Sequence, residues 1–373
     1  MMKQLKIAVL KDRYPTLFNT PRISRHTIKR VPFIPTHKIS HHIEGFTLPL
    51  AFGADLGHYV NRIPVVSRIP FIMSFESHLP RYFAGEHTKL FRLMRQQLTN
   101  PLCRQIIAMS KFAKNLFIRQ HENSHAFDDL MKKIQIIYPH IHLPIYDAHK
   151  KRTPGPLKLV FIGSHFGRKG GAVTVRAAEI AKARNLPVRF HIISSLQAGH
   201  GIWTDPHSED FFNPYFKLLN LDNITFDRHL PNVRIFDVLK ESDFSILTTF
   251  SDTFGYSAIE SLSTGTPVIA TPQGALPEFV QHEQNGLMIP LATDPFGEWQ
   301  HIKRNDNGSA AYAAMFKAEI DRMAEDLIKA ISPYIDNPEK ITPMRANARN
   351  TAESMFDTQK TSVYLDALYD QSV

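Results

Sequence analysis

Residues 251–290 read SDTFGYSAIESLSTGTPVIATPQGALPEFVQHEQNGLMIP, and this stretch decides the fold class of the chain. It follows an apolar run, Phe244–Phe250 (FSILTTF), that is typical of a buried parallel strand. A helix is predicted to begin near Gly255 and to end around Thr264, and Pro267–Thr271 (PVIAT) predicts the next strand. The stretch therefore predicts a strand–helix–strand unit of an α/β fold with a parallel sheet.

Two carboxylates in this stretch, Asp252 and Glu260, are separated by seven residues. Asp252 precedes the predicted helix, whereas Glu260 lies more than one turn inside it and can face a ligand at the helix N-terminus. The free backbone N–H groups of such an N-terminus bind anions. A sugar nucleotide fits such a site. Its phosphate would bind the amides, its sugar hydroxyls one acid, and its ribose hydroxyls the other acid.

The same stretch resembles the donor-site signature of the retaining glycosyltransferase family 4, which is the group 1 glycosyl transferases of the two-domain GT-B architecture. The matching residues are Phe254, Gly255, Glu260, Gly265, Pro267, Val268, Ile269, Ala270, Gly274 and Glu278. Two positions differ from the family pattern, because Asp252 stands where the first Glu is usual and Thr253 replaces a Gly. Asp keeps the charge but has a shorter reach, so the change bears on sugar selectivity more than on activity.

A second glycine-rich stretch supports this interpretation. Leu157–Ser164 (LKLVFIGS) predicts a strand, and residues 165–183 (HFGRKGGAVTVRAAEIAKA) predict a loop that opens a helix. Gly163 ends the strand, and Gly170 and Gly171 allow the backbone to approach a ligand at the helix start. The stretch thus predicts a second ligand-binding turn ahead of the first.

Lys169 lies in this turn, where its ammonium can meet the negative charge of a diphosphate. The turn resembles the family element Gly-x-x-x-x-x-Lys-Gly, whose Lys neutralises the leaving nucleoside diphosphate. Ser164 stands where relatives often have an Arg, and we expect Arg168 to supply that charge.

The resemblance implies retaining, metal-independent transfer of a sugar, with attack on the face of the donor that the diphosphate leaves. The amides of residues 254–256 would support the phosphate or the sugar. His229, in RHLP at 228–231, lies where relatives contact the base. The predicted catalytic residues are Lys169, Asp252 and Glu76. The predicted donor-binding residues are Gly163, Ser164, Arg168, Lys169, His229, Asp252, Phe254, Gly255, Tyr256 and Glu260.

The acceptor side is predicted from residues 69–81 (IPFIMSFESHLPR). Many relatives end a strand here with a His that faces the reaction centre. By position this residue is Glu76, with His78 two residues further on. Either side chain could contact the donor or the acceptor, and the alternative is a polar pair at a strand end.

The length of 373 residues accommodates two domains, each with its own core. Strand-like runs occur at Leu5–Leu10, Ile69–Phe75, Gln105–Met109, Ile134–Tyr138, Leu157–Ser164, Val188–Ser195, Ile224–Phe226, Phe244–Phe250 and Pro267–Thr271. A proline-rich basic stretch at 143–156 predicts a linker. We therefore expect an α/β GT-B fold: an acceptor-side Rossmann-like domain at 1–150, a donor-binding Rossmann-like domain at 151–356, and the donor cleft between them. A C-terminal helix at about 357–373 would pack back on the first domain.

Composition excludes several other classes of protein. The single cysteine, Cys103, cannot form an internal disulfide and suits a reducing compartment. No CxxC, HExxH or Asp-x-Asp motif is present, so we expect no metal and no cofactor, the substrate being a UDP-, GDP- or ADP-sugar. No run of about 18 apolar residues predicts a membrane span.

Charge is unevenly distributed along the chain. Residues 1–150 contain 22 Lys and Arg against 9 Asp and Glu, a net charge of +13, whereas the remainder carries −4. One basic cluster comprises Arg22, Arg25, Lys29 and Arg30, and a second comprises Lys89, Arg92 and Arg95. The second predicts either an amphipathic helix lying on a membrane or a solvated surface helix.

The basic half predicts an anionic partner, namely a membrane surface or a lipid-linked or glycan acceptor. Nucleic acid is not expected, since no recognised module accompanies the charge. We expect a cytoplasmic protein that docks on the inner face of the membrane and acts in polysaccharide, lipopolysaccharide or glycolipid synthesis of the cell envelope. Two alternatives remain at this stage: a GT-B sugar-nucleotide 2-epimerase, and a catalytically degenerate module that binds membranes or polyanions.

Overall fold

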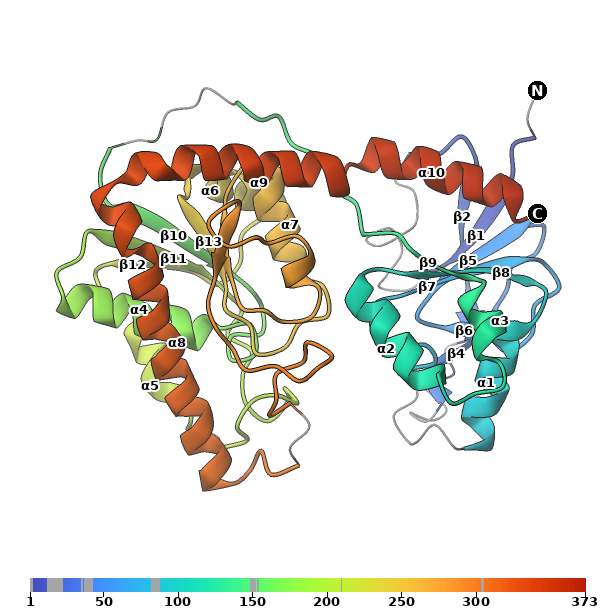
Figure 1. Ribbon diagram of the computed structural model, residues 1–373, viewed down its shortest axis with the longest axis horizontal. Helices are drawn as coiled ribbons and strands as arrows, with labels where there is room; N and C mark the ends of the chain where they lie inside the picture. Colours follow the sequence, from blue (N-terminus) through green and yellow to red (C-terminus); the bar gives the residue numbers. More distant parts are fainter. Residues whose placement is uncertain are drawn as a thin grey trace. The chain divides into compact units, whose positions relative to one another are not determined.

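The computed structural model describes residues 3–11, 23–34, 36, 43–81, 88–147, 152, 154–208, 210–302 and 305–373. The chain forms two compact units, Met1–His142 with Met355–Val373 (unit 1) and Leu143–Ser354 (unit 2). Each unit contains a six-stranded parallel sheet. Figure 1 shows the helices that pack on these sheets. The predicted α/β class with two Rossmann-like domains is therefore confirmed.

The sheet of unit 1 has the strand order β2-β1-β5-β7-β8-β9. Its strands are β1 (Lys6–Leu10), β2 (Thr27–Val31), β5 (Leu56–Val60), β7 (Phe71–Phe75), β8 (Cys103–Ala108) and β9 (Ile134–Ile136). Its helices are α1 (Lys89–Thr99), α2 (Lys111–His121) and α3 (Phe127–Met131). A small second sheet joins β3 (Phe33–Ile34), β4 (Phe46–Pro49) and β6 (Ile63–Pro64).

The two faces of this sheet have separate cores, as the two-residue period of a strand requires. Phe71, Met73 and Phe75 of β7 share a core with residues of α1 and α2. Ile72 of β7 instead shares a core with Leu365 of α10 (Thr358–Gln371), the last helix of the chain. Unit 1 is thus completed by the C-terminal helix.

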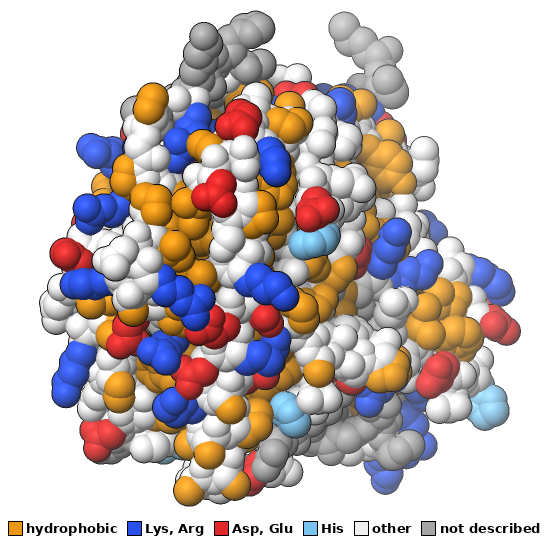
Figure 2. Space-filling view, turned by 60° about the vertical axis from the view of Figure 1, so that its left-hand side comes forward, with side chains coloured by type: hydrophobic (Ala, Val, Ile, Leu, Met, Phe, Trp, Pro, Cys, Tyr) orange, Lys and Arg blue, Asp and Glu red, His pale blue; other side chains and the backbone are white. Residues whose placement is uncertain are grey.

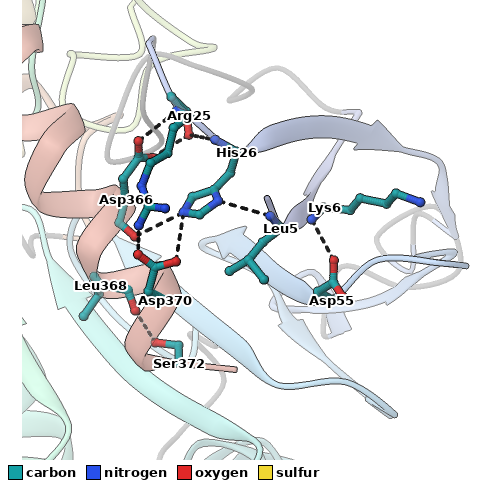
Figure 3. A network of polar contacts seen from close by, with 10 residues as sticks. Leu5, Lys6, Arg25, His26, Asp55, Asp366, Leu368, Asp370 and Ser372 are labelled. Atoms are coloured by element: carbon teal, nitrogen blue, oxygen red, sulfur yellow. Dashed lines mark hydrogen bonds and ion pairs between the residues drawn. The ribbon is translucent and has the colours of Figure 1, made fainter. Parts of the chain in front are cut away.

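Polar contacts fix α10 to the first strands of unit 1 (Figure 3). Asp366 accepts a hydrogen bond from the backbone N–H of Arg25 at 2.9 Å, and Asp370 pairs with the Arg25 guanidinium. The buried His58 of β5 joins its Nδ1 to the hydroxyl of Tyr369 and its Nε2 to that of Ser74, both at 2.7 Å. These partners satisfy the polar atoms of a histidine that is fully buried.

The second basic cluster lies on α1, where Lys89 and Arg92 are exposed and Arg95 lies over the ring of Phe91. The apolar side of α1, formed by Phe91, Met94 and Leu98, is buried. Its apolar side is therefore already covered by protein, which contradicts a helix that inserts this side into a membrane. Arg22 of the first cluster lies outside the described residues.

The sheet of unit 2 has the strand order β12-β11-β10-β13-β14-β15. Its strands are β10 (Leu157–Ile162), β11 (Val188–Ile193), β12 (Ile224–Asp227), β13 (Phe244–Leu247), β14 (Val268–Ala270) and β15 (Gly286–Met288). Its α-helices are α4 (Gly171–Ala183), α5 (Asn213–Leu218), α6 (Asn232–Glu241), α7 (Tyr256–Ser263), α8 (Ala310–Asp336) and α9 (Ile341–Met355, which ends at the border of unit 1). Short 3-10 helices occupy Leu276–Glu278 and Pro338–Lys340.

Alternation along β10 again separates two faces. Leu159 and Phe161 belong to the large core that α4 and α8 cover, whereas Val160 packs with Leu239 of α6. Ion pairs join the outer sides of α4 and α8, where Arg176 meets Asp321 at 2.9 Å, and Arg184, directly after α4, meets Glu325 at 2.8 Å. On the face that Figure 2 shows, basic and acidic side chains are interspersed, so no single sign of charge dominates it.

Neither a membrane-spanning helix nor a cluster of metal ligands occurs among the described residues. Among the described helices, none has the length and apolar content that crossing a membrane requires. Within the same residues, no group of three or more His, Cys, Asp and Glu side chains is arranged to hold a metal ion.

Candidate active site

A cavity of about 330 Å³ lies in unit 2 at the carboxyl ends of β10, β11 and β12. Parallel strands bring the residues that follow them to one edge of the sheet, where α/β folds bind ligands. The residues that line the cavity are Ile162, Gly163, Ser164, His165, Arg168, Lys169, Ile193, Ser194, Ser195, Arg228, His229, Leu230, Ile235 and Ser257. Five of the predicted donor-binding residues are thus brought together: Gly163, Ser164, Arg168, Lys169 and His229.

The turn between β10 and α4 is held by its own backbone and by close packing. Lys169 N–H donates to the carbonyl of His165 at 3.0 Å, and Gly171 N–H donates to that of Phe166 at 2.7 Å. Gly170 has φ +88°, and a methyl group there would lie 2.2 Å from the carbonyl oxygen of Thr248. Only glycine fits this position, because other residues strain in the left-handed region and their Cβ would collide with backbone.

Gly170→Ala should therefore destabilise unit 2 by at least about 2 kcal/mol, since strain at positive φ and a clash with backbone add together. The two tryptophans of the chain, Trp203 and Trp299, both lie in unit 2, so urea unfolding followed by their fluorescence measures this loss. Gly201→Ala is the matched control, because nothing lies within 4 Å of the added methyl group. Equal unfolding midpoints for the two variants would contradict the structural role of Gly170.

An ion pair joins the two predicted catalytic residues of unit 2. Lys169 Nζ donates to Asp252 Oδ2, and the side chains are 19% and 10% exposed. Burial alone would raise the pKa of Asp252, but the charges of Lys169 and Arg168 and hydrogen bonds from Lys169 and the Phe254 backbone lower it below its ordinary value. Asp252 is therefore ionised and holds the Lys169 ammonium at the cavity wall.

Arg168 links the same turn to the segment after β13. Its Nη2 approaches His165 Nδ1 at 2.8 Å, and its Nη1 donates to the carbonyl of Ser251. Its own carbonyl accepts from Phe250 N–H and from the Thr249 hydroxyl, both at 2.9 Å. Burial, followed by the charges of Arg168 and Lys169, lowers the pKa of His165, so its ring is neutral at pH 7 and Nδ1 can accept from Arg168.

The remaining predicted donor-binding residues lie at the start of α7. Gly255 caps the helix with φ +89°, and no side chain caps it. The Phe254 side chain is 2% exposed and stacks on Phe279, with ring centroids 5.3 Å apart. The Phe254 N–H hydrogen-bonds the Asp252 carboxylate and helps to hold the pKa of this acid below its ordinary value. The contact of the 254–256 amides with a ligand stays a prediction.

Glu260 and Tyr256 lie on α7 and do not line the cavity. Ser257, one turn before Glu260, does line it, and residues three apart lie on one side of a helix. Glu260 therefore lies on the side of α7 that carries Ser257 toward the cavity.

Glu76 and His78 belong to unit 1, directly after β7. Asn61 Nδ2 donates to Glu76 Oε1 at 3.3 Å, and Arg81 Nη1 lies 3.4 Å from the same oxygen. The side chain of Glu76 is thus held as part of a polar cluster at the end of the strand. The catalytic role of Glu76 and the acceptor contact of His78 stay predictions.

Several site residues were not predicted from the sequence. Ser194 and Ser195 follow β11, so the position after a parallel strand was the signal that could have found them. Arg228 follows β12 and belongs to the RHLP stretch that was predicted to contact the base. Asp205 had no such signal. Its carboxylate is fully buried and accepts from Gly199 N–H at 3.0 Å, and a methyl group on Gly167 would lie 2.2 Å from it. Asp205 therefore packs against Gly167 and supports the turn between β10 and α4.

Comparisons with known proteins found a matching family and several similar chains. The family model described as Glycosyl transferases group 1 matches residues 156–298. A D-inositol 3-phosphate glycosyltransferase of Mycobacteroides abscessus is 29% identical over 167 residues, which cover 42% of this chain and 36% of that relative. The protein of the same name from Pseudarthrobacter chlorophenolicus is 23% identical over 344 residues, 81% of this chain and 74% of the relative.

Among solved structures, HepE of Anabaena in complex with UDP-glucose has a TM-score of 0.60 at 14% identity. The similarity covers 99% of this chain and 100% of HepE. At this level of identity it shows the fold, which is the GT-B fold with its two Rossmann-like domains.

Proposed function

Because this chain belongs, through residues 156–298, to the group 1 glycosyl transferases and has their GT-B fold, we propose that it transfers a sugar from a nucleoside-diphosphate sugar to an acceptor. The observation that supports this most is the Lys169–Asp252 ion pair beside a cavity whose wall is a glycine-rich turn. An ammonium and a carboxylate side by side match the two halves of such a donor, its diphosphate and its sugar hydroxyls.

In the proposed reaction the bond between the anomeric carbon and the diphosphate oxygen breaks, and a bond to the acceptor oxygen forms on the same face. Lys169 stabilises the charge that develops on the leaving diphosphate, a contribution that is often the largest in catalysis. Asp252 binds sugar hydroxyls and Glu260 binds the ribose. The leaving phosphate oxygen takes the proton of the acceptor hydroxyl, so no metal and no protein nucleophile are required.

The donor is tested first by thermal unfolding with UDP-, GDP- and ADP-glucose. HepE was solved with UDP-glucose, which makes the uridine compound the first choice. A nucleotide that binds the folded state stabilises it by an amount that grows with the logarithm of its concentration divided by its Kd, so one nucleotide class should raise the Tm and the others should not. If none of the three raised the Tm, the proposal would be wrong.

The reaction is tested next with the donor that binds. Transfer should give a product whose anomeric configuration, read by NMR, equals that of the donor, and EDTA should not change the rate. An inverted product would contradict the retaining mechanism, and loss of the rate in EDTA would contradict metal independence. Rapid conversion of the donor to an epimer without acceptor would identify a 2-epimerase instead.

We further propose that the acceptor lies at an anionic membrane surface. Lys89 and Arg92 on α1 are exposed while the apolar side of the helix is buried, so docking would be electrostatic. Each basic side chain near such a surface contributes about 1 kcal/mol. The double variant Lys89→Gln/Arg92→Gln should therefore sediment less with vesicles of anionic lipid.

The matched control is Lys182→Gln/Arg184→Gln, which removes the same charge from half-exposed positions at the end of α4 in unit 2. Its sedimentation should equal that of the natural protein. Equal sedimentation of the natural protein with neutral and anionic vesicles would contradict membrane docking and favour a soluble acceptor.

A further inference from the structure

We infer that Arg228 is a phosphate-binding residue of the cavity that selects for the diphosphate of the donor. The inference rests on the proposed function and names a residue that the sequence had associated only loosely with the base. Arg228 is the first residue after β12, which is the edge strand of the sheet. It lines the cavity together with the Gly163–Lys169 turn that follows β10.

Three cationic side chains line the cavity: Arg168, Lys169 and Arg228. The first two already have partners. Lys169 is paired with Asp252, and Arg168 is held between His165 and the carbonyl of Ser251. Either residue can approach a phosphate only while it shares or gives up these contacts.

Arg228 differs from both, because it is exposed and no hydrogen bond or ion pair to another described residue holds its guanidinium. The acid next to it in the chain, Asp227, accepts from His191 Nε2 at 2.7 Å. The carboxylate nearest in sequence is therefore occupied by another partner. Arg228 is the cation of the cavity that meets an incoming anion without first losing a contact.

The charges of the cavity are complementary to a diphosphate. The three cations and the single paired carboxylate, Asp252, give a net charge of +2. The diphosphate of a sugar nucleotide carries two negative charges, and without Arg228 one of them would stay uncompensated. A guanidinium also presents two parallel N–H donors that match two phosphate oxygens, which an ammonium cannot do.

A nucleotide titration series with Arg228→Gln and Arg228→Lys tests the assignment. The probes are UDP, GDP and ADP, followed by UMP, GMP or AMP and the uncharged nucleoside of whichever base binds. In Arg228→Gln the loss of a charge-assisted contact should lower the affinity for the nucleoside diphosphate by about tenfold or more. The affinity of Arg228→Gln for the nucleoside should lie within twofold of that of the natural protein. The affinity of Arg228→Lys for the diphosphate should lie between those of the natural protein and Arg228→Gln.

Salt dependence gives a second readout. The slope of log Kd against log salt concentration for the diphosphate should become shallower in Arg228→Gln, since one ionic contact is lost. Arg234→Gln is the matched control, because Arg234 is an exposed arginine on α6 that faces Asp237 and does not line the cavity. It should leave affinity and slope unchanged.

The outcomes separate this inference from the proposed function. If Arg228→Gln lowered the affinity for the nucleoside as much as the affinity for the diphosphate, Arg228 would bind the base and the inference would be wrong. If the natural protein bound the diphosphate and Arg228→Gln bound it equally well, the inference would fail while the proposed function stood. If the natural protein bound none of the three diphosphates, both would be overturned.

Discussion

Lys169→Ala is expected to lower kcat/KM for sugar transfer by at least tenfold, while Lys169→Arg retains part of the activity. The ammonium is placed at the cavity wall by Asp252, where it can meet the charge that develops on the leaving diphosphate. Arginine keeps the charge but changes its shape and reach, so it rescues only in part. Steady-state kinetics with the donor that binds measure both effects.

A loss of folding must be separated from a loss of catalysis, because removing Lys169 leaves the Asp252 carboxylate buried without its partner. Breaking a buried pair costs about 3–5 kcal/mol, whereas replacing both partners by neutral groups costs much less. The double variant Lys169→Met/Asp252→Asn should therefore have a higher free energy of unfolding than Lys169→Ala, measured by urea unfolding and tryptophan fluorescence. Its kcat/KM should nevertheless be as low as that of Lys169→Ala. Lys182→Ala, at the other end of α4, is the control for a lysine outside the cavity. An unchanged kcat/KM in Lys169→Ala would remove this residue from the mechanism.

Asp205→Asn is expected to make unit 2 more stable than the natural protein at pH 8. Burial raises the pKa of Asp205 to about 7, against the opposing effects of hydrogen bonds from Gly199 and Thr204 and of the Arg168 charge. The folded protein therefore binds this proton more tightly than the unfolded chain, so stability falls as the pH rises from about 4 to about 7. An asparagine has no charge to bury and keeps the shape of the side chain.

The advantage of Asp205→Asn should grow by about 2–3 kcal/mol between pH 5 and pH 8, since burial in the folded state raises the pKa of Asp205 to about 7. Urea unfolding at the two pH values, followed by tryptophan fluorescence, measures this difference. Asp237→Asn, an exposed acid on α6, should show no such dependence. A stability difference that is the same at both pH values would show that Asp205 is not a buried, protonated acid.

The buried parallel strands were predictable because they read as continuous apolar runs. β1, β7 and β9 of unit 1 and β10, β11, β13 and β14 of unit 2 fall within predicted runs, whereas β8 begins two residues before its run and β12 ends one residue after its run. β2 was not predicted, since it is an edge strand whose residues, TIKRV, are mostly exposed and polar. β5 was not predicted either, because Gly57 and His58 interrupt its apolar residues. His58 is tolerated there only through Ser74 and Tyr369, which come from elsewhere in the chain.

The two halves of the site were predictable for a different reason. Both turns are marked by local features that a few adjacent residues decide. These features are a glycine that needs positive φ, a helix that starts without a side-chain cap, and a charged residue beside them. Gly170 and Gly255 have this conformation, so their positions in the sequence already marked both turns.

The sequence by itself therefore determined the α/β class, most strands and both ligand-binding turns, because these depend on short-range apolar patterns and on backbone conformations that few residues allow. Tertiary structure alone decided which charges meet. Lys169 and Asp252 are 83 residues apart and pair only because β10 and β13 are neighbours in the sheet. The same packing occupies Arg168, buries Asp205 under the turn and leaves Arg228 as the cation that faces the cavity without a described partner. Pairing and burial depend on distances in space, which sequence separation does not record.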